Sequence, residues 1–80
     1  MTFEFVRDLL RKQPFEPFRV VMDNGKAYEV RYARMAMATH VALLVGIGEG
    51  SDYPDGVPDD FKACAMSRIK AVEPLVDVVA

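Results

Sequence analysis

The chain has 80 residues, of which 51% are hydrophobic and 28% charged, and its formal net charge is −2. These values are typical of one globular domain spanning residues 1–80, and they argue against a disordered chain. The single cysteine, Cys64, excludes an intramolecular disulfide, and a lone histidine, His40, argues against structural zinc. Because so short a chain has a small core, we expect self-association to supply part of its stability.

The N-terminal segment MTFEFVRDLLRK carries Glu4, Arg7 and Asp8 inside its apolar pattern, unlike a signal peptide. No segment of the sequence reaches membrane-spanning length, so we expect no membrane association. Together with the lone thiol, these features predict a cytoplasmic protein.

The first predicted element is an amphipathic helix of about three turns. Thr2 is a favourable N-cap, and Val6, Leu9 and Leu10 recur at helical spacing. Pro14 ends the helix because it disfavours helical geometry in the residue before it. A helix of this length is unstable alone, so we expect it to pack against the rest of the chain.

The segment PFEPF, residues 14–18, allows two interpretations. Its P-x-x-P spacing is that of the extended ligands bound by SH3 domains. Such ligands usually lie in long proline-rich tracts, whereas this segment lies between the helix and the first predicted strand. We interpret it as a structural joint in which Phe15 and Phe18 pack the helix onto the sheet.

A β-hairpin follows, and side-chain polarity predicts its register. A two-residue turn would place charged residues on the core face. A three-residue loop that ends at Gly25, with Gly25 at positive φ, instead pairs Phe18 with Val30 and Arg19 with Glu29. We therefore predict this register, with an ion pair between Arg19 and Glu29.

Residues 35–48 contain no charged side chain, and residues 41–47 are predicted to form a strand that is apolar on both faces. Two explanations fit: a second protomer covers one face, or the strand is buried on both faces within one chain. In the first case the oligomer interface would include Val41, Leu43, Leu44 and Val45.

Residues 48–60 are predicted to form an acidic loop, because Gly, Pro and Asp recur there. The spacing of its five carboxylates matches no calcium-binding loop, so we interpret it as solvated. The GIGEG sequence at 46–50 resembles a nucleotide-binding loop, but Pro54 and Pro58 disfavour the helix that must follow such a loop.

Two strands are predicted near the C-terminus, over residues 61–66 and 69–75, joined by a turn at Ser67 and Arg68. In the last strand, the odd-numbered residues 69, 71 and 73 are expected on one face, opposite Lys70 and Val72. Residues 76–80 are either a frayed end or a strand added to the sheet edge of a neighbour.

The predicted fold is mainly β (α+β), with one N-terminal helix and about five antiparallel strands in a strongly bent small barrel. This layout resembles the Sm-like version of the SH3-type barrel. The segments PFEPFRVVMDNGKAYEV, MAM, PDGVPDDF and SRIKAVEPL resemble a group of small uncharacterised bacterial proteins that share a Pro-Phe-x-Pro-Phe-Arg segment. That group has no assigned activity, so the resemblance implies no functional residues.

No catalytic residue, metal site or cofactor site is predicted, and we do not expect an enzyme. Cys64 and His40 would form a nucleophile and base only within hydrogen-bonding distance of each other. Cys64 lies between Ala63 and Ala65 in a predicted strand, which is typical of a small buried hydrophobic residue.

The sequence supports two hypotheses about function. The first is a non-catalytic protein-interaction or assembly module that forms a homo-oligomer; a different protein partner cannot be named from the residues. The alternative is an Sm-like RNA-binding protein, although the acidic net charge and the predicted inward orientation of Tyr28 and Tyr32 disfavour it. The candidate nucleic-acid surface consists of Arg19, Lys26, Arg31 and Arg34.

Overall fold

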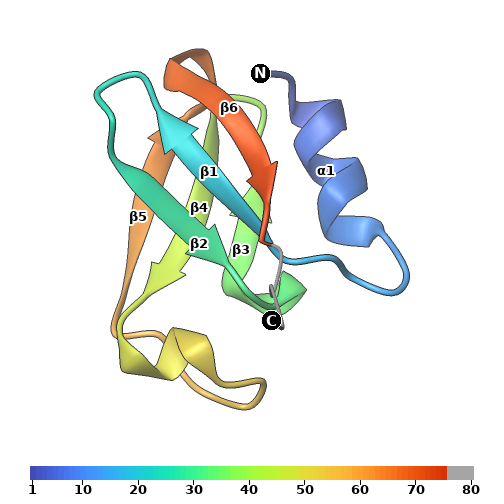
Figure 1. The fold of residues 1–80 in the computed structure, drawn as a ribbon, viewed down its shortest axis with the longest axis vertical. Helices are drawn as coiled ribbons and strands as arrows, with labels where there is room; N and C mark the ends of the chain where they lie inside the picture. The colour runs from blue at the N-terminus through green and yellow to red at the C-terminus, as the bar shows by residue number, and fades with distance from the viewer. Residues whose placement is uncertain (76–80) are drawn as a thin grey trace, which may run out of the picture.

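One helix and six strands form the fold in the computed structural model, which describes residues 1–75. The elements are α1 (Phe3–Arg11), β1 (Phe18–Met22), β2 (Ala27–Val30), β3 (Ala36–Ala38), β4 (Ala42–Ile47), β5 (Asp60–Ala65) and β6 (Ile69–Pro74). The strands form two antiparallel three-stranded sheets, ordered β2-β1-β6 and β3-β4-β5 (Figure 1). The predicted mainly β, α+β class is confirmed, and in the described residues no ladder of hydrogen bonds joins the two sheets.

The β1–β2 hairpin has the predicted register. Phe18 lies opposite Val30 and Arg19 lies opposite Glu29. Gly25 has a φ of +87°, and an ion pair of 3.6 Å joins the Arg19 guanidinium to the Glu29 carboxylate. The polarity of the side chains is therefore sufficient to predict this register, because a shift by one residue would reverse every face.

The helix packs one apolar residue into the core and contacts β3. The Thr2 hydroxyl accepts a hydrogen bond from the Phe5 N–H at 3.2 Å, which confirms the predicted N-cap. Val6 is fully buried. The helix ends at Arg11, before Pro14, and the chain then turns into β1.

The hydrophobic core lies between the two sheets and α1. Every charged or polar side chain in residues 1–75 is at least partly exposed. The core therefore depends on apolar burial alone. Its buried members are Val6, Phe18, Val20, Met22, Val30, Leu43, Val45, Cys64, Met66 and Ile69.

The strand predicted over residues 41–47 is present as β4, and the apolar segment also contains β3, which pairs with β4 in a short hairpin. The structure therefore has six strands where about five were predicted. The Thr39 hydroxyl accepts hydrogen bonds from the N–H groups of Val41 and Ala42 and so closes the turn between β3 and β4. The acidic loop is irregular except for a single 3₁₀ turn at Glu49–Asp52.

The predicted faces of the last strand are wrong in part. Val72 lies opposite Val20 and packs against the core, as Ile69 does, although the two are an odd number of positions apart in the strand. The cause is a register irregularity opposite Val21 and Met22, where β6 contains one extra residue. Such a bulge reverses the alternation of faces from that point on.

Residues 76–80 lie outside the described residues, so the two interpretations of that segment stay open. Within residues 1–75, no helix is both long enough and apolar enough to cross a membrane.

Candidate interaction surface

The structure divides the predicted interface residues between the core and the surface. Leu43 and Val45 point into the core and are fully buried, so they cannot contact a partner. Leu44 points the other way and is partly exposed, while Val41 lies in the β3–β4 turn with 76% of its surface exposed. One face of β4 is therefore core, and the other face is turned outward.

The outward face of the β3-β4-β5 sheet carries no charged side chain. Leu44 lies between Met37 of β3 and Ala63 of β5, and cross-strand partners point to the same side of a sheet. Met37 is 62% exposed and Phe61 of β5 is 50% exposed. We call this surface the outer face; its residues are Met37, Ala42, Leu44, Gly46, Phe61, Ala63 and Ala65.

Part of the outer face is covered by the acidic loop. A methyl group added at Gly46 would lie 3.0 Å from the Pro58 Cβ, so the loop crosses the sheet at this position. The exposed part of the outer face therefore centres on Met37, Leu44 and Ala63.

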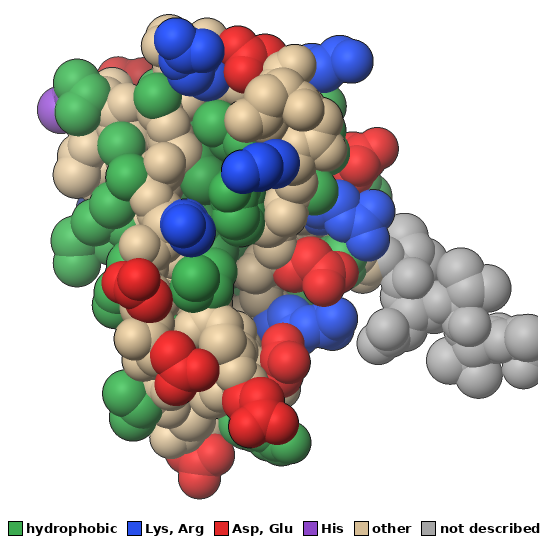
Figure 2. Space-filling model, turned by 90° about the vertical axis from the view of Figure 1, so that its left-hand side faces the viewer, with side chains coloured by type: hydrophobic (Ala, Val, Ile, Leu, Met, Phe, Trp, Pro, Cys, Tyr) green, Lys and Arg blue, Asp and Glu red, His purple; other side chains and the backbone are tan. Residues whose placement is uncertain are grey.

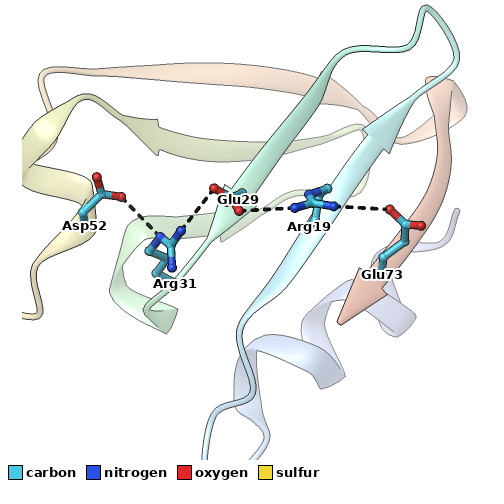
Figure 3. A network of polar contacts seen from close by, with 5 residues as sticks. All are labelled: Arg19, Glu29, Arg31, Asp52 and Glu73. Atoms are coloured by element: carbon cyan, nitrogen blue, oxygen red, sulfur yellow. Dashed lines mark hydrogen bonds and ion pairs between the residues drawn. The ribbon is translucent and has the colours of Figure 1, made fainter. Parts of the chain in front are cut away.

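The opposite side of the molecule is charged. In Figure 2, hydrophobic side chains gather at the upper left, whereas lysine, arginine and acidic side chains are spread over the top, the centre, the right and the lower part of the view. A chain of ion pairs crosses the β2-β1-β6 sheet and reaches the acidic loop (Figure 3). Its contacts are Glu73–Arg19 at 4.0 Å, Arg19–Glu29 at 3.6 Å, Glu29–Arg31 at 3.3 Å and Arg31–Asp52 at 3.4 Å.

The residues of the candidate nucleic-acid surface do not form one basic patch. Arg19 lies on β1 and Arg31 directly follows β2, and the Glu29 carboxylate contacts both guanidinium groups. The Arg34 guanidinium donates hydrogen bonds to the carbonyls of Pro54 at 2.8 Å and Gly56 at 2.7 Å, and so holds the acidic loop. Lys26 lies in the β1–β2 loop and is exposed.

The aromatic residues near these arginines differ in burial. Tyr28 is partly buried and packs against the core, as predicted. Tyr32 is half-buried and lines a shallow, open pocket with Pro17, Arg31 and Asp52. No fully exposed aromatic ring therefore accompanies the arginines on this sheet.

Cys64 and His40 occupy different environments. Cys64 is fully buried, as predicted, and this burial raises the pKa of its thiol above the ordinary value. His40 is exposed in the β3–β4 turn, where its ring lies 4.4 Å from the ring of Phe3. Among residues 1–75, no group of three or more His, Cys, Asp or Glu side chains is placed to hold a metal ion.

Sequence reasoning missed the contribution of β5 and β3 to the outer face. Met37, Phe61 and Ala63 were not among the predicted interface residues. The sequence does contain a signal: the apolar residues at positions 61, 63 and 65 alternate with residues of other kinds. This period of two indicates a strand that carries the three apolar side chains on one face. Their proximity to Leu44 depends on strand pairing, which the sequence does not specify.

Comparison of the chain with protein-family models, with curated proteins and with solved structures finds no match.

Proposed function

We propose that this protein is a non-catalytic assembly module that self-associates through the outer face of its β3-β4-β5 sheet. The observation that carries the proposal is the exposure of Met37 and Phe61 on a sheet face without charged side chains. Contiguous apolar surface of this kind marks interaction sites in soluble proteins. We propose the cytoplasm as its compartment, on the ground of its single thiol.

Desolvation favours the outer face over the charged side of the molecule. Burying Met37, Leu44 and Ala63 against a partner removes apolar surface from water and requires no charged group to lose its hydration. Burying the other sheet would desolvate Arg19, Glu29 and Arg31, and their mutual attraction often fails to offset that cost.

The RNA-binding alternative has less support. Arg19 and Arg31 are within ion-pair distance of carboxylates, and Arg34 is bonded to loop carbonyls. Binding a phosphate backbone through them would require breaking these contacts, and the net charge of −2 would repel the polyanion.

The proposal is tested by measuring molar mass against concentration, using sedimentation equilibrium. The wild-type chain is expected to exceed the monomer mass. Met37→Glu should weaken association by at least about tenfold, because an unpaired buried carboxylate costs several kcal/mol. A 62% exposed side chain tolerates the change in the monomer, and circular dichroism verifies that the variant is folded.

Phe5→Glu is the matched control. Phe5 is an exposed apolar residue of α1, away from the outer face, so the same charge change there should leave association unchanged. A wild-type chain that remains monomeric at millimolar concentration would refute the proposed function. Equal weakening by both substitutions would show that the outer face is not the interface.

A further inference from the structure

The strand β5 has one unpaired edge. It pairs with β4 on one side only, and it is the last strand of its sheet in the described residues. The Met66 N–H donates to the Val41 carbonyl at 2.9 Å. Because hydrogen-bonded pairs alternate along an antiparallel ladder, residues 60, 62 and 64 bond to β4. The N–H and carbonyl groups of Phe61, Ala63 and Ala65 therefore point to the open edge.

Asp60 and Lys62 are charged residues of the kind that discourages edge pairing, but other backbone groups of this edge remain open. Within the described residues, one backbone group of this edge has a hydrogen-bond partner in the chain: the Phe61 N–H donates to the Asp60 carboxylate at 2.7 Å. The backbone N–H and carbonyl groups of Ala63 and Ala65, which point to the open edge, make no hydrogen bond within residues 1–75. The strand contains no proline, and its four residues 60–63 are all exposed.

We infer that a second copy of this chain pairs with β5 through its own β5, antiparallel and with Ala63 on the two-fold axis. This inference rests on the proposed function, because it requires self-association, and it adds a contact along the strand edge to the contact through the outer face. The result would be one continuous six-stranded sheet, β3-β4-β5 of one copy followed by β5-β4-β3 of the other.

Charge complementarity favours the antiparallel orientation. The carboxylates of Asp59 and Asp60 lie at the start of β5. Arg68 follows its end; its guanidinium lies 3.8 Å from the Asp23 carboxylate and is largely exposed. Antiparallel pairing brings the acidic start of one strand beside the basic end of the other. Parallel pairing would place the acidic ends together and the basic ends together, which is unfavourable.

A two-fold register centres on one residue of β5, because opposite residues must point to the same side of the sheet. Centring beyond Ala63 would oppose Phe61 to residues that follow β5. Centring on Lys62 would put two ammonium groups directly opposite each other, which is destabilising. Centring on Phe61 would oppose Ala63 to the partner's Asp59, whose N–H already donates to the Ile47 carbonyl at 2.8 Å. Neither register uses all of the open backbone groups.

Centring on Ala63 uses every outward group of the edge, once the Phe61 N–H has exchanged the Asp60 carboxylate for the partner strand. Ala63 exchanges two hydrogen bonds with its own copy, and Phe61 exchanges two with the partner's Ala65 at each end. The small side chains leave room for the Phe61 ring to cover Ala65 on the outer face. The row Met37–Leu44–Ala63 then continues into the same row of the partner, so the two outer faces become one apolar surface.

Disulfide trapping tests the register. Ala63→Cys is introduced into the Cys64→Ala chain, which removes the only native thiol. A hydrogen-bonded antiparallel pair places the two Cα atoms about 5.5 Å apart, within the range of a disulfide. Under mild oxidation, Ala63→Cys is expected to form a covalent dimer at least about tenfold faster than Phe61→Cys, since pairing gives its thiols a high effective concentration.

Phe61→Cys and Ala65→Cys are the matched controls. Each alone should cross-link slowly, because in this register each lies roughly 13 Å along the strand from its own copy. The two variants mixed should cross-link rapidly with each other. Fastest linkage of Phe61→Cys to itself, or equal rates at all three positions, would overturn the inference.

The outcomes separate this inference from the proposed function. If the wild-type chain self-associates while Ala63→Cys cross-links no faster than the controls, the edge pairing is wrong and the outer-face contact stands. If the wild-type chain is a monomer in sedimentation and Ala63→Cys does not cross-link, both are refuted.

Discussion

At the scale of single residues, Gly25 holds a backbone conformation that other residues adopt at a cost. Its φ is +87°, and an added Cβ would meet no atom within 4 Å. Gly25→Ala should therefore destabilise the fold by about 1–2 kcal/mol through the backbone alone. Urea denaturation measures this loss. Gly25→Asn should lose less, because asparagine tolerates positive φ better, and an alanine variant as stable as wild type would contradict the prediction.

Cys64 gives the folding free energy a pH dependence with a defined sign. Burial raises its pKa in the folded state, so above the ordinary thiol pKa the unfolded chain binds fewer protons than the folded chain. Below the ordinary thiol pKa, the contribution of Cys64 to the free energy of unfolding is therefore constant. As the pH rises above it, the free energy of unfolding decreases. Denaturation of wild type and Cys64→Ala between pH 7 and pH 10, roughly the range of thiol titration, should show a steeper decline in wild type.

The same burial predicts low reactivity of the thiol. The native protein should react with a thiol reagent only as fast as it opens, whereas the urea-unfolded chain should react at once. Rapid labelling of the folded protein would contradict the full burial of Cys64.

At the scale of elements, the segment PFEPF connects α1 to β1 and fixes how they pack. Phe18 is only 2% exposed, and its ring centroid lies 6.0 Å from that of the half-buried Phe15. Phe18→Ala should cost about 3–5 kcal/mol, as deletion of a buried aromatic ring does. The free energy of unfolding, measured with urea, provides the test.

Phe15→Ala is the matched comparison for this element. Phe15 retains part of its exposure to solvent, so the same truncation should cost less than at Phe18. Little loss at either position would instead support the interpretation of PFEPF as an exposed ligand motif.

At the scale of the whole molecule, the two sheets present opposite chemistry to solvent. The β2-β1-β6 sheet carries the chain of ion pairs, and its exposed pairs contribute little stability individually, about 0–1 kcal/mol each. The β3-β4-β5 sheet presents apolar side chains. A small core with one apolar outer face gains stability by covering that face.

This arrangement predicts a melting temperature that depends on protein concentration. Association stabilises only the folded chain, so the melting temperature should rise with concentration in wild type. Met37→Glu should shift the increase to concentrations at least about tenfold higher, while leaving the melting temperature at high dilution nearly unchanged. Calorimetry over a hundredfold range of concentration gives both values, and a melting temperature independent of concentration in wild type would contradict the prediction.

Several features of the fold could be predicted because neighbouring residues determine them. Thr2 caps the helix through a hydrogen bond to a residue three positions away. The β1–β2 register follows from a short loop and from the polarity of the residues that flank it, which is why Arg19 was correctly placed opposite Glu29. Cys64 was recognised as a core residue because small apolar neighbours surround it in the sequence.

The sequence by itself therefore determined the helix, the first hairpin and the apolar nature of β4. Only the tertiary structure decided which side of β4 is core, because that depends on the opposing sheet and helix. It also decided that Val72 faces inward, through a bulge set by pairing with β1, and that Arg31 contacts Asp52. The physical reason is common to all three: pairings between residues distant in the chain depend on how whole elements pack together, and local side-chain patterns do not encode them.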